Sequence, residues 1–110
     1  HGGVAHFDVE GLTPNQLSRA ARAMSLVLVL QPAVTGGGLR VWPARHREYD
    51  LPSSAELRQS SALMAYAPGD LVLFESRRLH QIQPFGGTRA RITVTVHAAE
   101  IDVGRWESWF

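Results

Sequence analysis

Turn signals built on glycine and proline separate a series of short apolar segments along this sequence. The intervening segments are rich in branched aliphatic residues, and turn signals recur roughly every 8–12 residues, a spacing typical of β-sandwiches and barrels. We therefore predict an all-β fold. The expected strands cover residues 25–31, 39–42, 63–67, 71–74, 80–84 and 92–96, with a further short strand at 49–51 inside a surface excursion at 44–61.

Two of these segments show the strand pattern most clearly. Ser25–Gln31 contains a continuous branched apolar run and ends before Pro32, which predicts a strand covered on both faces. Residues 91–97 alternate strictly, so successive side chains are expected on opposite faces of their strand. One face would carry Ile92, Val94 and Val96, and the other Arg91, Thr93, Thr95 and His97. In the strand at 39–42, we expect Pro43 to end the pairing.

Only one segment has the features of a helix. Thr13 suits the N-cap position and Pro14 the first helical position, and alanine and leucine follow, so we predict one short helix within Thr13–Ala23. The segment 105–110 contains two tryptophans and a phenylalanine. We expect it to cover a face or an edge of a sheet, and the alternative is an exposed tail that binds a partner.

The composition narrows the chemistry that is available. The chain has 110 residues, a net charge of +1, no cysteine, and 11 basic residues that are all arginine. A near-neutral charge argues against nucleic acid or an anionic membrane as a partner. The longest apolar run, Leu26–Leu30, is far shorter than the roughly 20 residues of a membrane-spanning helix. We therefore expect one cytoplasmic domain over residues 1–110, whose chemistry uses His, Asp, Glu, Arg and hydroxyl groups.

His6, Asp8 and His80 form the candidate metal site. In an extended segment His6 and Asp8 point to the same side, because side chains alternate along a strand. His80 can supply a third ligand, and two imidazoles with one carboxylate are the ligand set of non-haem Fe(II) oxygenases. The alternatives are a surface pair for His6 and Asp8 and a structural role for His80. We expect His97 to be a pocket-wall or core residue rather than a ligand.

Further motifs accompany these residues in a fixed order along the chain. The elements are His6/Asp8, Gly37-Gly38-Leu39, Pro68-Gly69-Asp70, His80, Pro84, and then Arg89 or Arg91. In this order and spacing the chain resembles the 2-oxoglutarate- and Fe(II)-dependent dioxygenases, in particular their prolyl 4-hydroxylase-like branch. The resemblance extends from residue 6 to about residue 98.

This resemblance implies a double-stranded β-helix, the jelly roll also found in cupins, as the catalytic core. It implies that His6, Asp8 and His80 bind Fe(II) and that an arginine binds the distal carboxylate of 2-oxoglutarate. Arg89 fits by its distance in sequence from His80, whereas Arg91, which we favour, fits by its position in the last strand. With O2, such enzymes convert 2-oxoglutarate to succinate and CO2 and hydroxylate a C–H bond, here of an unknown small-molecule or peptidyl substrate.

The resemblance also bears on the type of reaction and on the extent of the fold. Asp8 favours hydroxylation over halogenation, because halogenating relatives carry a small residue in place of the carboxylate. The family has further elements before the His-x-Asp segment, so we expect a segment upstream of His1 to complete the fold. Two alternatives are a cupin-like metal-binding module or isomerase that uses no 2-oxoglutarate, and a structural β-domain that displays Trp106 and Trp109 to a partner.

Overall fold

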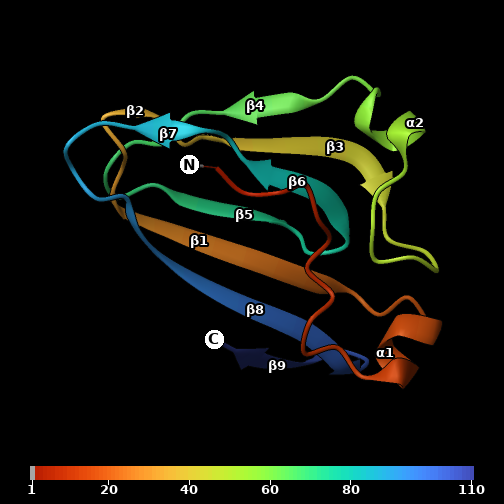
Figure 1. The fold of residues 1–110 in the computed structure, drawn as a ribbon. Coiled ribbons are helices and arrows are strands. Elements are labelled where there is room, and N and C mark those ends of the chain that lie inside the picture. The colour runs from red at the N-terminus through yellow and green to blue at the C-terminus, as the bar shows by residue number, and fades with distance from the viewer. Residues whose placement is uncertain (1) are drawn as a thin grey trace.

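The computed structural model describes residues 2–110, which form three antiparallel sheets (Figure 1). The largest has the order β5-β1-β8-β9, with β5 at Leu71–Glu75, β1 at Ala23–Gln31, β8 at Ile92–Asp102 and β9 at Arg105–Trp109. The second has the order β4-β3-β6, with β4 at Ala62–Met64, β3 at Leu39–Arg45 and β6 at Arg78–Ile82. The third pairs β2 at Thr35–Gly36 with β7 at Phe85–Gly86. The predicted all-β, jelly-roll-like core is thereby confirmed.

The two larger sheets form two layers with the main apolar core between them (Figure 1). Val27 of β1 and Phe74 of β5 belong to the same buried cluster as Leu39 of β3. β1 is central in its sheet, because it pairs with β5 on one side and β8 on the other. A second buried cluster consists of Phe7, Trp42 and Leu79. Trp42 belongs to β3 and Leu79 to β6, so Phe7 fixes the N-terminal segment to the β4-β3-β6 sheet.

The helices differ from the prediction in extent and in number. α1 covers only Pro14–Ser18, because the chain reverses at Ala20, where φ is +51°, and then enters β1. The expectation of one helix is wrong, since α2 spans Ser54–Leu57 within the segment predicted as a surface excursion. Ser53 and Glu56 form a capping box at its start, and this Ser-x-x-Glu pattern was the available sequence signal.

Two strand predictions are wrong in detail. The structure has no strand at residues 49–51, although it describes all three. Pro43 does not end β3, which continues to Arg45 past a shift in its register with β6. Proline has no N–H to donate, so it is tolerated where the ladder is interrupted in this way. The remaining predicted strands are present with different ends: β4 stops at Met64 instead of residue 67, β6 spans Arg78–Ile82 instead of 80–84, and β8 extends well beyond residue 96.

β1 is covered on one face only, contrary to the prediction from its apolar run. Its inner residues Ser25 and Val29 are fully buried, whereas Leu28 and Leu30 on the outer face are 37% and 53% exposed. The outer face continues onto the neighbouring strands, where Leu71, Leu73, Ile92 and Val94 are also exposed. The apolar run of β1 therefore does not correspond to a strand that residues 2–110 cover on both faces.

The tryptophan-containing segment forms β9, which confirms its predicted place at a sheet edge. β9 pairs with β8 in a register that sets Trp109 opposite His97 and Trp106 opposite Glu100. Among residues 2–110, no helix has the length and apolar character needed to cross a membrane.

Gly38, directly before β3, permits a close approach of two strands. A Cβ at Gly38 would overlap the backbone carbonyl oxygen of Met64, which belongs to the paired strand β4. Gly38→Ala should therefore lower the free energy of unfolding by about 1–3 kcal/mol, as overpacking of a tight site does. Urea denaturation monitored by circular dichroism measures this. The matched control is Gly86→Ala, whose Cβ meets only the Thr35 hydroxyl at 3.6 Å; equal stability of the two variants would contradict the steric explanation.

Candidate metal centre

Backbone pairing brings the N-terminal segment to β6. The amides of His6 and His80 each donate to the other's carbonyl oxygen at 3.0 Å, forming an isolated antiparallel bridge. The Asp8 amide donates to the Ser76 carbonyl at 2.9 Å. The segment from His6 to Asp8 is therefore held in an extended form by β6 and the turn before it, without being part of a longer strand. Residues more than 70 positions apart in sequence are thereby adjacent.

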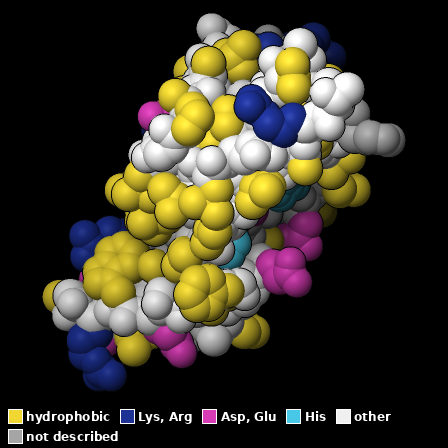
Figure 2. All heavy atoms as spheres, turned by 90° about the vertical axis from the view of Figure 1, so that its left-hand side faces the viewer, with side chains coloured by type: hydrophobic (Ala, Val, Ile, Leu, Met, Phe, Trp, Pro, Cys, Tyr) yellow, Lys and Arg dark blue, Asp and Glu magenta, His cyan; other side chains and the backbone are white. Residues whose placement is uncertain are grey.

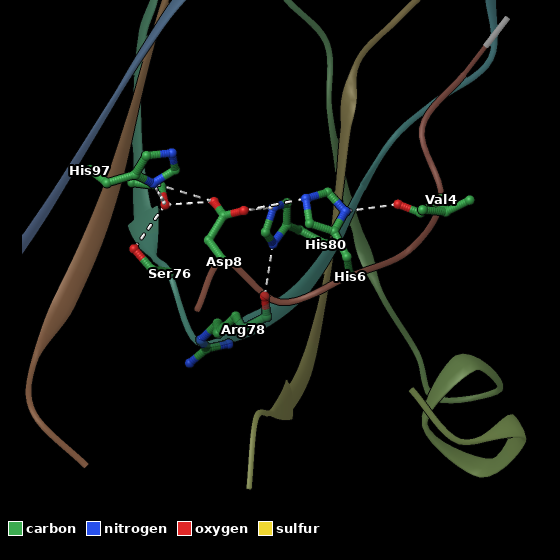
Figure 3. A network of polar contacts seen from close by, with 8 residues as sticks. Val4, His6, Asp8, Ser76, Arg78, His80 and His97 are labelled. Carbon is green, nitrogen blue, oxygen red and sulfur yellow. Dashed lines mark hydrogen bonds and ion pairs between the residues drawn. The ribbon is translucent and has the colours of Figure 1, made fainter. Parts of the chain in front are cut away.

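The three predicted ligands converge on one another (Figure 3). Nε2 of His6 lies 3.2 Å from Oδ1 of Asp8, and Nε2 of His80 lies 3.4 Å from the same oxygen. One ligand atom from each residue falls within 4.8 Å of the others, a spacing that could hold a metal ion. The alternation of His6 and Asp8 predicted from sequence is what places both side chains on the side of His80.

Backbone carbonyls fix the tautomer of both imidazoles. Nδ1 of His6 lies 2.9 Å from the Val4 carbonyl oxygen, and Nδ1 of His80 lies 2.8 Å from that of Arg78 (Figure 3). A carbonyl only accepts hydrogen bonds, so each Nδ1 carries a proton and donates. Nε2 of each ring faces Asp8: it donates to the carboxylate while the ring is protonated, and it has a free lone pair for a metal once that proton is lost. This arrangement of a ring N–H on a backbone carbonyl is the usual support of a metal-binding histidine.

The second carboxylate oxygen of Asp8 is bound by a residue that sequence analysis missed. The hydroxyl of Ser25, on the inner face of β1, donates to Oδ2 of Asp8 at 2.7 Å. Ser25 is fully buried and also lies within hydrogen-bond distance of the Ser76 hydroxyl (2.8 Å) and of Nδ1 of His97 (3.2 Å). The sequence feature that could have identified Ser25 is a serine at an inward position of an otherwise apolar strand. Ser25 thus leaves Oδ1 alone to face the two histidines.

Burial and hydrogen bonding act on the Asp8 carboxyl in opposite directions. Burial alone would raise its pKa, but hydrogen bonds from His6, His80 and Ser25, with the His80 charge, hold that pKa well below its usual range. The hydrogen bond with Asp8 raises the pKa of His6 above its ordinary value of 6.5, burial opposes this, and the Val4 carbonyl adds to the increase. The carboxylate is therefore ionised at neutral pH, as a metal ligand must be.

The two candidate arginines have different surroundings. Arg91 is half-buried, with its guanidinium 5.5 Å from the ring centre of Tyr66 and 6.0 Å from that of Phe85. One of its nitrogens lies 3.4 Å from the Thr93 hydroxyl. Nε of Arg91 and the hydroxyl of Tyr66 are both buried without a hydrogen-bond partner among the described residues. Arg89 instead lies exposed in the loop before β8.

Tyr66 is a second residue whose position the sequence does not reveal. Burial raises the pKa of its phenol, and the positive charge of Arg91 opposes that increase. A buried hydroxyl and a buried guanidinium N–H that lack partners can both donate to an anion. Tyr66 lies in the connection between β4 and β5, and Arg91 lies in the loop before β8. No local sequence motif therefore links the two residues.

The raised pKa of His6 predicts pH-dependent metal binding. A metal must displace the proton from Nε2 of His6, so the affinity for Co(II) should fall about tenfold per pH unit below the His6 pKa. The loss should begin above 6.5, because the pKa is raised. Calorimetric titration with Co(II) between about pH 5 and pH 8 tests this. Asp8→Asn should bind Co(II) weakly at every pH, and a wild-type affinity independent of pH would contradict the assignment of His6.

One of three comparisons with known proteins found a match. A family model described as 2OG-Fe(II) oxygenase superfamily matches residues 1–98, which include all three converging side chains and both arginines. The search of curated proteins and the search of solved structures returned no match. A match over this much of the sequence decides the classification: the chain belongs to the 2OG-Fe(II) oxygenase superfamily.

Proposed function

We propose that this protein is an Fe(II)- and 2-oxoglutarate-dependent dioxygenase of the prolyl 4-hydroxylase-like branch. It would hydroxylate a C–H bond of a small-molecule or peptidyl substrate and release succinate and CO2. The observation that carries the proposal is the convergence of two Nε2 atoms and one carboxylate oxygen, each oriented by its own hydrogen bond. The order of the motifs from His6 to Arg91 supports the narrower assignment to the branch.

The donor set fits Fe(II). Two neutral imidazoles and one carboxylate can occupy one face of an octahedral ion and leave the remaining positions open to cosubstrate and O2. His6, Asp8 and His80 would hold the ion, and iron, when bound, would supply the activation of O2. Ser25 would keep the second oxygen of Asp8 away from the ion, so that the carboxylate uses a single position. A carboxylate ligand, rather than a vacant position for a halide, supports hydroxylation.

Arg91 is our choice for the anchor of 2-oxoglutarate. A carboxylate placed between its guanidinium and Tyr66 would satisfy the two buried donors that lack partners among residues 2–110. A guanidinium is suited to this because it can form two parallel, charge-assisted hydrogen bonds with one carboxylate. Arg89, exposed in its loop, has no comparable enclosure. The half-buried setting of Arg91 thus favours it over the alternative that sequence spacing left open.

The first test is turnover of 2-oxoglutarate. The protein loaded with Fe(II) should release succinate slowly without substrate, and Asp8→Ala should reduce this release to background by removing a metal ligand. Asp102→Ala, which removes a carboxylate at the exposed end of β8, is the matched control and should retain full release. Succinate is measured by mass spectrometry, and circular dichroism checks the fold. Wild-type release that survives in Asp8→Ala would remove Asp8 from the site.

The second test separates the two arginines and excludes the cupin-like alternative. Arg91→Ala should weaken 2-oxoglutarate binding by about 10- to 100-fold, because a charge-assisted pair with a carboxylate is lost. Tyr66→Phe should weaken it by about 5-fold, the effect of one hydroxyl donor. Arg89→Ala serves as the matched control, with binding unchanged in calorimetry on the metal-loaded protein. If Arg89→Ala is the weak binder, the anchor is misassigned, and if neither arginine matters, the 2-oxoglutarate function is wrong.

A further inference from the structure

A cavity adjoins the candidate metal centre on the side of β9. It has a volume of about 500 Å³ and is lined by Asp8, Glu10, Gly11, His97, Trp109 and Phe110. In the space-filling view from one end of the molecule, histidine side chains are visible in a hollow bordered by hydrophobic and acidic side chains (Figure 2). Because Asp8 belongs both to the metal centre and to this lining, a molecule in the cavity would lie next to the metal.

The hydrogen bonds of Ser25 determine which nitrogen of His97 carries the proton. Ser25 has one hydroxyl proton, which it donates to the Asp8 carboxylate at 2.7 Å. Its oxygen, 3.2 Å from Nδ1 of His97, can then only accept from that nitrogen. A proton on Nδ1 also suits the distance of 3.8 Å to Oδ2 of Asp8, where a bare lone pair would be repelled. In the neutral ring of His97, Nε2 therefore has the free lone pair, on the side away from Asp8 (Figure 3).

Apart from the indole N–H of Trp109, the polar side-chain groups of the lining are hydrogen-bond acceptors. Asp8 and Glu10 contribute carboxylates, and His97 contributes the lone pair of Nε2. Glu10 is exposed and has no ion pair or hydrogen bond with any described residue. No arginine, hydroxyl or amide side chain is among the lining residues. A ligand of this cavity gains most if it brings its own donors and a positive charge.

Aromatic rings form the apolar part of the lining and are held in place. Trp109 lies opposite His97 in the pairing of β8 with β9, and the two rings stack with centres 5.9 Å apart and an interplanar angle of 29°. The indole packs against Gly11, where a Cβ would come within 2.6 Å of the indole nitrogen. Gly11 thus allows the indole to approach the N-terminal segment closely, with Nε1, Cε2 and Cζ2 as the nearest ring atoms. An immobilised indole face is a good surface for a cation.

We propose, on the basis of the function proposed above, that this cavity binds the substrate and selects one with an ammonium or guanidinium group. The cation would lie against Trp109 and donate to Glu10 and to Nε2 of His97. The carboxylate of Glu10, which has no partner among the described residues, would repel an anionic substrate.

The test compares three probes of similar shape and different charge. Phenethylamine, 2-phenylethanol and 3-phenylpropionate are titrated calorimetrically into protein loaded with Fe(II) and 2-oxoglutarate in the absence of O2. Phenethylamine should bind most tightly and 3-phenylpropionate least. Equal binding of the three, tighter binding of 3-phenylpropionate, or no binding of phenethylamine would each overturn the inference.

Variants with matched controls locate the binding of phenethylamine. Glu10→Gln should weaken it by about 2- to 5-fold, as expected for an exposed ion pair, and leave 2-phenylethanol unaffected. Glu48→Gln, which neutralises an exposed carboxylate outside this cavity, should change the binding of neither probe.

The tryptophan variants test the aromatic wall. Trp109→Ala should weaken the binding of phenethylamine by about 10-fold, Trp109→Phe should restore most of the loss, and Trp106→Ala should have no effect. Trp106 is the control because its ring stacks with Arg22 outside this cavity. Identical effects of Trp106→Ala and Trp109→Ala would place the probe elsewhere and overturn the inference.

Succinate release from the same preparations separates this inference from the proposed function. Release of succinate without a preference for phenethylamine overturns the cationic substrate and leaves the dioxygenase function standing. A preference for phenethylamine in a protein that releases no succinate overturns the dioxygenase function, and with it the role of the cavity as a substrate site.

Discussion

The reciprocal backbone hydrogen bonds between His6 and His80 are the constraint on which the candidate site depends. They fix two imidazoles side by side, with ring centres 4.4 Å apart, although the residues come from distant parts of the sequence. The same pairing places Phe7 in a buried cluster with Trp42 and Leu79, so the N-terminal segment is held by apolar packing as well. Because side chains alternate, burying Phe7 on one side necessarily turns His6 and Asp8 to the other. Packing and ligand geometry are therefore two results of one backbone arrangement.

Burial of the Asp8 carboxylate is the main electrostatic cost of this arrangement. Without a metal, hydrogen bonds from the histidines and Ser25 compensate for it, and protonated His6 is part of that compensation. Since the pKa of His6 is raised in the fold, its contribution to stability is complete below 6.5 and is lost as the pH rises through the raised value. A bound cation would take the place of that proton. Oδ1, which faces the two histidines without a metal, is also the oxygen that would face a bound cation.

Sequence reasoning succeeded where the relevant periodicity is local. The alternation in the His6–Asp8 segment and along 91–97 predicted which side chains share a face, and the paired structure bears this out for His6 and Asp8. It could not identify Ser25 or Tyr66, because their significance comes from contacts with residues far away in the sequence. Apolar continuity misled for β1, whose outer leucines are exposed among the described residues. The capping box of α2 is a local sequence pattern, but it lies in the polar segment 44–61, for which no helix was predicted.

The two oxygens of Asp8 connect the candidate metal centre to the neighbouring cavity. Oδ1 faces His6 and His80, whereas Oδ2 accepts from Ser25, whose oxygen in turn meets His97. A change in the charge that Oδ1 faces alters how strongly Oδ2 accepts, and hence how Ser25 and the His97 ring are held. His97 stacks on Trp109, so this chain of contacts extends to the wall of the cavity. The hydrogen bond of one buried serine therefore determines both how the carboxylate is presented to a metal and which nitrogen of His97 is presented to a ligand.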